Sequence, residues 1–143
     1  IAGDGELRAE LEAGAAALGV RDRVRFLGWR RDLPVIYAAT DVFVLTSRNE
    51  GTPVALIEAM ASGVPGVSTN VGGVGDVINH PDVGVAVTGL DALANGVSAL
   101  LSDPARRVAI GERARARVIE HYAFDRLAAD IERLYHGLLA PRS

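Results

Sequence analysis

The sequence predicts an α/β protein built on a Rossmann-like, doubly wound parallel sheet. Short apolar runs such as "DVFVLTS" and "PGVST" have the composition of strands that are buried on both faces. Between these runs lie longer segments in which apolar residues recur at helical spacing. Because strands that alternate with helices form βαβ units, we expect ligands to bind at the carboxyl ends of the strands.

The first part of the chain is predicted to contain two short strands and two helices. "IAG" ends a strand, and a glycine turn leads into a helix that Gly19 terminates. This helix is indicated by apolar residues at helical intervals: Leu7, Leu11, Ala15 and Leu18. "RVRFLG" is a second strand, and Asp32 is the expected N-cap of the short helix in "RDLPVIYAAT".

The rest of the chain continues the alternation and ends in three helices. Thr52 and Pro53 form the expected cap and first turn of a helix. That helix runs to about Ser62, and Gly63 stops it. "NVGGVGDVIN" is a glycine-rich turn into a short helix, and "VGVAVT" is the last strand. Further helices are expected over residues 90–101, 104–121 and 124–139.

Composition and charge exclude several classes of function. The 143 residues are 49% hydrophobic and 23% charged, which suits a compact soluble domain, and no apolar run reaches the roughly 20 residues of a membrane-spanning helix. A net charge of −3 argues against a nucleic-acid partner, and we interpret the basic cluster from Arg106 to Arg117 as a solvated helix face. There is no cysteine, and the three histidines lack the spacing of zinc ligands, so we expect no metal site.

Three strand-end loops are expected to meet at one edge of the sheet and to form the rim of a pocket. They bring together Glu50, the helix start at Thr52 and the pair Gly72 and Gly73. A helix N-terminus offers unpaired N–H groups, and glycine lets the backbone approach a ligand closely, so phosphate is the expected guest. The alternative is that the glycines are ordinary turn residues and that Glu50 is an ordinary loop carboxylate.

Glu58 is the only ionisable side chain between Thr52 and Gly75. It lies about 9 Å along the helix from Thr52, which matches the span from a pyrophosphate to a ribose. A carboxylate buried among Ile57 and Met60 is costly without hydrogen-bond donors, so we expect Glu58 to lack a partner until ribose hydroxyls bind. The alternative is a lone polar residue on a half-exposed helix.

The segment "GDGELR" is not a dinucleotide-binding fingerprint. Arg8 replaces the third glycine, and no acidic residue closes the next strand, so an NAD site is excluded. Trp29 follows a strand on the expected rim, where it covers either a nucleotide base or the edge of the core.

The stretch "EGTPVALIEAMASGVPGVSTNVGGVGDVI" resembles the donor-binding signature of retaining GT-B glycosyltransferases, specifically glycosyltransferase family 4. The specific signal is the spacing from Glu50 to Glu58, followed by "AMASGVP". The resemblance extends from "IAGDGELR" to the terminal helices and matches the C-terminal, nucleotide-sugar-binding half of the GT-B fold. It implies a cytoplasmic enzyme, without a cofactor, that transfers a sugar from a UDP-, GDP- or ADP-sugar to an acceptor hydroxyl with retention.

The resemblance also implies a role for each residue of the site. Glu58 holds the ribose hydroxyls, and Glu50 is the catalytic residue that contacts hydroxyls of the donor sugar. The backbone that contacts the sugar and the phosphates is implied to be that of Gly51, Thr52, Pro53 and Val54. The phosphates are also flanked by Gly72 and Gly73. The base is implied to meet the backbone of Leu27, Gly28 and Trp29. No D-x-D metal motif is present, which agrees with a mechanism that needs no metal.

The chain departs from the family pattern at several positions. Thr52 and Pro53 stand where an aromatic residue and a glycine are common. Asp76 replaces the usual glutamate, and Gly66 replaces a β-branched residue. The upstream arginine and lysine that neutralise the diphosphate are not in this sequence, nor is the acceptor-binding N-terminal domain. We therefore expect residues 1–143 to form one nucleotide-sugar-binding domain, truncated on its N-terminal side, that binds donor or nucleotide weakly and does not turn over.

Two other functions stay open at this point. A non-catalytic nucleotide or nucleotide-sugar sensor would carry the same site, and a native start near Ile1 would favour it. A nucleotide-sugar epimerase or hydrolase of related architecture would need further acid–base groups, for which Glu50 is the only clear candidate. The missing N-terminal domain is the expected partner, and peripheral membrane association of the longer parent protein is compatible with the resemblance.

Overall fold

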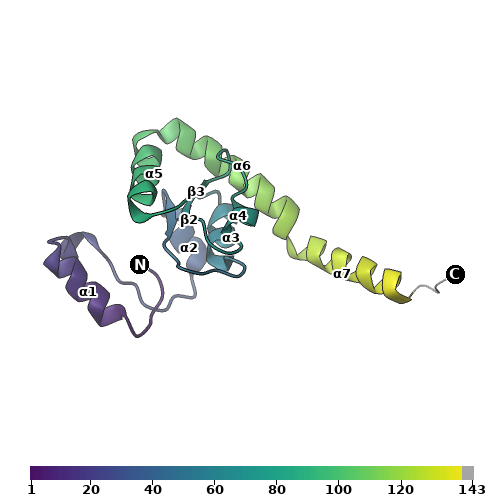
Figure 1. Cartoon of the computed structure of the whole chain (residues 1–143), viewed down its shortest axis with the longest axis horizontal. Helices are drawn as coiled ribbons and strands as arrows, with labels where there is room; N and C mark the ends of the chain where they lie inside the picture. Colours follow the sequence, from purple (N-terminus) through teal and green to yellow (C-terminus); the bar gives the residue numbers. More distant parts are fainter. Residues whose placement is uncertain (140–143) are drawn as a thin grey trace. The chain divides into compact units, whose positions relative to one another are not determined.

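The computed structural model describes residues 1–139 and shows two compact units (Figure 1). The amino-terminal unit is Ile1–Ile36, and the carboxy-terminal unit begins at Tyr37. Helix α2, Leu33–Ala38, contains the boundary between them. A single domain over the whole chain stays a prediction.

The amino-terminal unit contains a helix and two paired segments. Its helices are α1, Arg8–Ala17, and a 3-10 helix, η1, Arg21–Arg23. The amide of Leu27 donates to the carbonyl of Ile1 at 2.8 Å, and the amide of Gly3 donates to that of Gly28 at 2.9 Å. The pairing forms only isolated bridges, so "IAG" and "RVRFLG" are not the regular strands that we predicted. Two segments that pair only with each other are marginal, and Gly28 leaves the extended region with φ +65°.

The carboxylate of Asp32 pairs with Arg30 instead of capping α2. It accepts hydrogen bonds from the Nε and an Nη atom of Arg30, and the first of these bonds is 2.7 Å long. The hydrogen bonds from Arg30 lower the pKa of Asp32. Asp32 stands directly before α2, as predicted, and its carbonyl accepts from the amides of Val35 and Ile36, but a charged donor two residues away holds its carboxylate.

The carboxy-terminal unit contains a parallel sheet of three strands. The strands are β1 (Phe43–Leu45), β2 (Gly66–Thr69) and β3 (Val85–Val87), in the order β1-β2-β3. Their register pairs Val44 with Val67 and Ser68 with Ala86. The three strands predicted in this part of the chain are confirmed at their centres, and the α/β class with a parallel sheet is confirmed with them.

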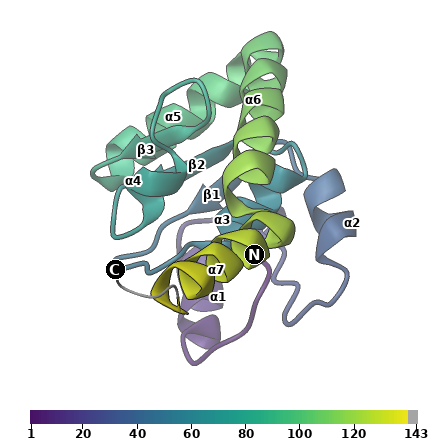
Figure 2. The ribbon, with the colours of Figure 1, turned by 90° about the vertical axis from the view of Figure 1, so that its right-hand side faces the viewer.

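Helices cover both faces of this sheet (Figure 2). They are α3 (Val54–Ala61), α4 (Val74–Val77), α5 (Leu90–Ser102) and α6 (Pro104–Tyr122), whereas α7 (Phe124–Leu139) follows α6 and buries no residue. Leu56 and Met60 of α3 belong to the core that includes Phe43. Leu93 of α5 belongs to a second core that includes Val67. Because alternate residues of a strand point to opposite faces, the sheet is covered on both sides, as a doubly wound fold requires.

Helix α6 holds the ends of two other helices with arginine side chains. Arg115 donates to the carbonyl of Ala61 at 2.6 Å, at the C-terminus of α3. Arg117 donates to the carbonyls of Val77 and Asp76 at 2.9 and 2.6 Å, at the C-terminus of α4. A cation in this position satisfies orphan carbonyls and complements the helix dipole. The basic cluster is thus largely a solvated face, as predicted, because Arg106, Arg113 and Arg115 are exposed, and the half-buried Arg117 departs from that interpretation.

Helix α7 ends the described chain with exposed apolar side chains. Leu127, Ile131, Leu134 and Leu138 recur at helical spacing and are all exposed. Within residues 1–139, no helix combines the length and the apolar character that a bilayer crossing needs.

Candidate functional site

Two segments that follow neighbouring strands cross in close backbone contact. The amide of Gly73 donates to the carbonyls of Glu50 and Gly51, at 3.3 and 3.2 Å. A Cβ on Gly72 would lie 1.7 Å from the Glu50 oxygen, and a Cβ on Gly73 would lie 2.2 Å from the Gly51 oxygen. No other residue fits at either position without a shift of the backbone. The structure therefore brings the loop after β1 against the turn after β2.

The carboxylate of Glu50 is half-buried and held by the protein. The hydroxyl of Ser47 donates a short hydrogen bond to Oε1 of Glu50. The hydroxyl of Thr69 donates to the carbonyl of Ser47 at 2.6 Å, so the end of β2 fixes the loop that carries Glu50. Sequence reasoning missed Ser47. A hydroxyl three residues before a loop carboxylate is the signal that could have identified it.

Helix α3 begins one residue later than predicted. Its N-cap is Pro53, with φ −76° and ψ 75°, and no side chain caps it. The amide of Val54 donates to the carbonyl of Thr52 at 2.9 Å and closes an inverse γ-turn around Pro53. Thr52 is therefore not the cap, because Pro53 itself is not helical. The first-turn amides that lack an intrahelical acceptor belong to Ala55 and Leu56.

This helix start is a candidate site for an anion. Amides of the first turn and the helix dipole both favour negative charge, and the nearby glycine turn leaves backbone accessible. Of the predicted loop residues, Pro53 has no amide hydrogen to offer, and the amide of Val54 is already engaged. In the part of the chain that the structure describes, no group of three His, Asp or Glu side chains could hold a metal ion.

Glu58 lies on the exposed side of α3 and has a protein partner. The hydroxyl of Tyr37 donates to Oε2 of Glu58 at 3.0 Å and lies 3.4 Å from the carbonyl oxygen of Ala55. The expectation of a buried carboxylate without a partner is therefore wrong on both points. Helical spacing explains the exposure, because Val54, Glu58 and Ser62 recur every four residues on the side away from the core.

Tyr37 is the residue at this site that sequence reasoning missed. Its side chain is 7% exposed and meets the ring of Phe43 edge-on, with ring centroids 6.3 Å apart. Burial, assisted by the hydrogen bond with Glu58, raises the pKa of Tyr37 to about 12, so the phenol stays a donor at physiological pH. The sequence carried little signal, because 21 positions separate Tyr37 from Glu58.

The residues that were predicted to meet a nucleotide base belong to the amino-terminal unit. The amide of Leu27 and the carbonyl of Gly28 are both used in pairing with the first residues of the chain. Trp29 is 78% exposed and covers no core edge within that unit. Contact with a base stays a prediction for all three residues.

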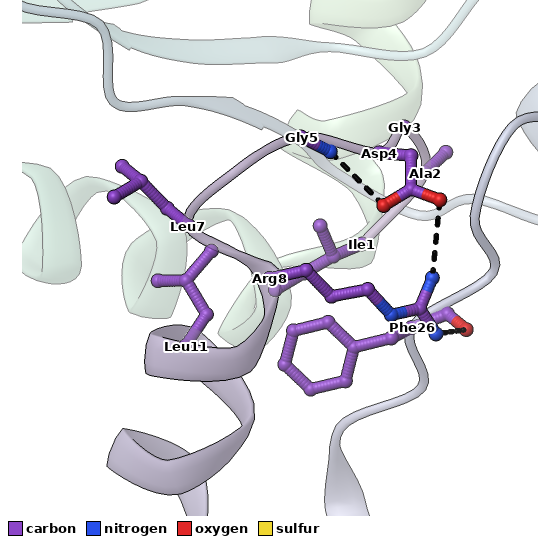
Figure 3. Close-up of a pocket in the computed structure, with 9 residues that line it drawn as sticks. All are labelled: Ile1, Ala2, Gly3, Asp4, Gly5, Leu7, Arg8, Leu11 and Phe26. Atoms are coloured by element: carbon purple, nitrogen blue, oxygen red, sulfur yellow. Dashed lines mark hydrogen bonds and ion pairs between the residues drawn. The ribbon is translucent and has the colours of Figure 1, made fainter.

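A shallow cavity of about 250 Å³ lies in the same unit, between the first residues and α1 (Figure 3). The guanidinium of Arg8 lies 3.7 Å from the carboxylate of Asp4 and donates to the carbonyl of Phe26 at 3.5 Å. The amide of Gly5 donates to the same carboxylate at 3.0 Å. The side chain that breaks the dinucleotide fingerprint is thus engaged with its own loop.

Comparisons with known proteins cover most of the chain. The family model described as "Glycosyl transferases group 1" matches residues 1–117. N-acetyl-alpha-D-glucosaminyl L-malate synthase from Bacillus anthracis is 36% identical over 85% of this chain and 32% of its own length. The chain thus spans about a third of the length of the curated relatives that it matches.

Solved structures share the fold. The crystal structure of Anabaena HepE in complex with UDP superposes with a TM-score of 0.90 and 27% identity, over 95% of this chain and 40% of that one. The C-terminal domain of a glycosyl transferase group 1 family protein (LpcC) from Francisella tularensis superposes with a TM-score of 0.74 and 26% identity, over 83% and 64%. The predicted GT-B fold class is confirmed by these similarities.

Proposed function

The chain belongs to the glycosyl transferases group 1 family, and on this basis we propose that it is the donor-binding domain of a retaining family 4 glycosyltransferase. The longer enzyme moves a sugar from a nucleotide-sugar to an acceptor hydroxyl and keeps the anomeric configuration. The observation that carries this proposal is the crossing of Glu50 and Gly51 with Gly72 and Gly73, just before the start of α3. The UDP in the HepE complex supports a nucleotide as the ligand.

The diphosphate of the donor is proposed to lie at the start of α3. The first-turn amides of Ala55 and Leu56 have no intrahelical acceptor there, and the helix dipole favours an anion. Gly72 is exposed and leaves backbone accessible on the other side of the phosphates, whereas the amide of Gly73 already donates to the carbonyls of Glu50 and Gly51. Neither Pro53 nor Val54 supplies a free amide, so this set of donors differs from the loop contacts that the family resemblance implies.

The two carboxylates are proposed to bind the sugars on either side of the diphosphate. Glu58 accepts hydrogen bonds from the ribose, and Glu50 accepts them from hydroxyls of the transferred sugar. Because Ser47 orients Glu50 in advance, its contacts with the sugar can be held through the transition state. The helix dipole and amides stabilise the departing diphosphate, which is the main electrostatic requirement of the transfer.

The rest of the proposed enzyme lies outside these 143 residues. In this proposal, the acceptor site belongs to an N-terminal domain of a longer cytoplasmic protein, and the basic residues that neutralise the diphosphate lie upstream of the present sequence in that protein. The chain alone therefore binds donor weakly, through amides and two carboxylates, and does not transfer the sugar.

Titration calorimetry of the 143-residue chain tests this proposal. We expect heat from UDP or UDP-glucose and none from NAD at the same concentration, with no sugar transfer to added acceptors. Preferential binding of NAD would contradict the proposal. A full-length protein that binds UDP-glucose but transfers no sugar would favour the nucleotide-sugar sensor instead.

A further inference from the structure

Tyr37 connects the core of the carboxy-terminal unit to the exposed carboxylate of Glu58. Its ring is held by burial and by the edge-on contact with Phe43, so the position of its hydroxyl is determined by packing. Tyrosine has only two side-chain torsions, which leaves the hydroxyl little freedom once the ring is fixed. The hydroxyl is therefore a rigid donor that is presented to α3.

The hydroxyl of Tyr37 has two acceptors on α3, one turn apart. Oε2 of Glu58 lies at 3.0 Å, and the carbonyl oxygen of Ala55 lies at 3.4 Å. A phenol carries a single proton, and a charged acceptor gives the stronger bond, so the carboxylate is the preferred partner. The bond restrains an exposed glutamate side chain that would otherwise sample many rotamers.

The rest of the Glu58 carboxylate is available to a ligand. An ionised carboxylate offers about four acceptor positions, and in the described part of the chain one hydroxyl, that of Tyr37, bonds to it. A ribose presents two adjacent hydroxyls, which match the acceptor positions that remain. A carboxylate that is already oriented loses less side-chain entropy when the diol binds.

We propose that Tyr37 is a positioning residue that orients the Glu58 carboxylate for the ribose diol and thereby makes the site selective for ribonucleotides. This inference rests on the proposed function, in which Glu58 binds ribose. It assigns selectivity to a side chain that does not touch the ligand and acts through Glu58. A purely structural tyrosine would influence all nucleotides alike, whereas a positioning residue affects only those with ribose hydroxyls.

The test compares UDP with 2′,3′-dideoxy-UDP by NMR titration of the 143-residue chain. We expect the wild-type protein to bind UDP at least about tenfold more tightly than the dideoxy compound. Tyr37→Phe should weaken UDP binding about fivefold, a fraction of the ordering entropy of a glutamate side chain, and leave dideoxy-UDP unchanged. Tyr135→Phe removes the same hydroxyl from an exposed side chain of α7 and should change neither affinity.

A second variant keeps the test decisive if Tyr37→Phe does not fold. Glu58→Asp retains the charge but shortens the side chain, so the carboxylate can no longer be held by Tyr37 at the same position. It should lose most of the preference for UDP over dideoxy-UDP. The inference would be overturned if Glu58→Asp kept the full preference for UDP over dideoxy-UDP. It would also be overturned if Tyr37→Phe weakened the binding of UDP and of dideoxy-UDP equally.

Failure of the inference is distinguishable from failure of the proposed function. If Glu58→Gln removes the preference for UDP while Tyr37→Phe keeps it, Glu58 binds ribose without help, and only the role of Tyr37 is refuted. If the wild-type protein binds UDP and dideoxy-UDP equally, or binds neither, both the ribose assignment and the inference fall.

Discussion

The backbone crossing at Gly73 gives a prediction whose size follows from the structure. A Cβ on this residue would lie 2.2 Å from the Gly51 oxygen, and side-chain Cβ atoms essentially never approach closer than 3.0 Å. In Gly73→Ala, residue 73 and the Gly51 carbonyl must therefore move apart by at least about 0.8 Å, the difference between those two distances. The φ of Gly73 is −74°, so alanine causes no backbone strain of its own there. Overpacking of this kind costs roughly 1–3 kcal/mol of unfolding free energy.

The same shift should damage the proposed donor site. It lengthens the hydrogen bonds from the Gly73 amide to Glu50 and Gly51, and thereby displaces the loop that carries Glu50. We expect UDP-glucose binding to weaken at least about tenfold, measured by NMR titration, with the stability loss measured by urea unfolding. Gly75→Ala is the matched control, because its Cβ would meet only Asn70, at 3.3 Å. If Gly73→Ala behaves like Gly75→Ala in both assays, the crossing does not shape the site.

Three further predictions concern other parts of the carboxy-terminal unit. In the full-length enzyme, Glu50→Ala should lower kcat in steady-state assays and leave UDP affinity nearly intact, because the carboxylate contacts the sugar. Unchanged turnover would show that Glu50 is an ordinary loop residue. The pKa of Tyr37 in the folded protein, about 12, exceeds its ordinary value near 10. The protonated phenol therefore adds at most roughly 2.7 kcal/mol to the unfolding free energy. This contribution is complete below pH 10 and is lost as the pH rises to 12. The sequence contains no lysine that would titrate in this range. In the wild type, tyrosinate absorbance should show a titration near pH 12, and urea unfolding should show a fall in unfolding free energy between pH 10 and 12. Both signals should be lost in Tyr37→Phe. Asp103 accepts from the Arg106 amide at 2.9 Å as the N-cap of α6, and Asp103→Ala should lower the unfolding free energy by about 1 kcal/mol; equal stability in urea would show that this cap contributes nothing.

The parallel sheet could be predicted because its strands differ clearly from their surroundings in composition. "DVFVLTS" and "PGVST" stand between segments with helical spacing, and strands buried on both faces need such apolar runs. "IAG" and "RVRFLG" have a similar composition but form only isolated bridges. Composition indicates which segments are suited to a sheet, whereas neighbouring strands decide whether a regular ladder forms.

Only one part of the candidate site could be predicted from the sequence. The meeting of Glu50 with Gly72 and Gly73 follows from the rule that parallel strands end at one edge, which is a property of topology. The burial of Glu58 was predicted from the apolar composition of its helix, without regard to the face on which it lies. Its pairing with Tyr37 joins two residues 21 positions apart within the folded carboxy-terminal unit, and no local pattern encodes that contact.

The central claim, that Glu58 binds the ribose of a nucleotide, is tested most directly by Glu58→Gln. Charge-assisted hydrogen bonds are worth roughly 1.5–3 kcal/mol each, so UDP binding to the 143-residue chain should weaken at least about tenfold. Unfolding free energy in urea should change by less than about 1 kcal/mol, because Glu58 is exposed and Tyr37 keeps the Ala55 carbonyl as an acceptor. Glu132→Gln, in the exposed part of α7, should alter neither quantity. A clear loss of stability in Glu58→Gln together with unaltered UDP affinity would show that the carboxylate serves the fold and would contradict the account.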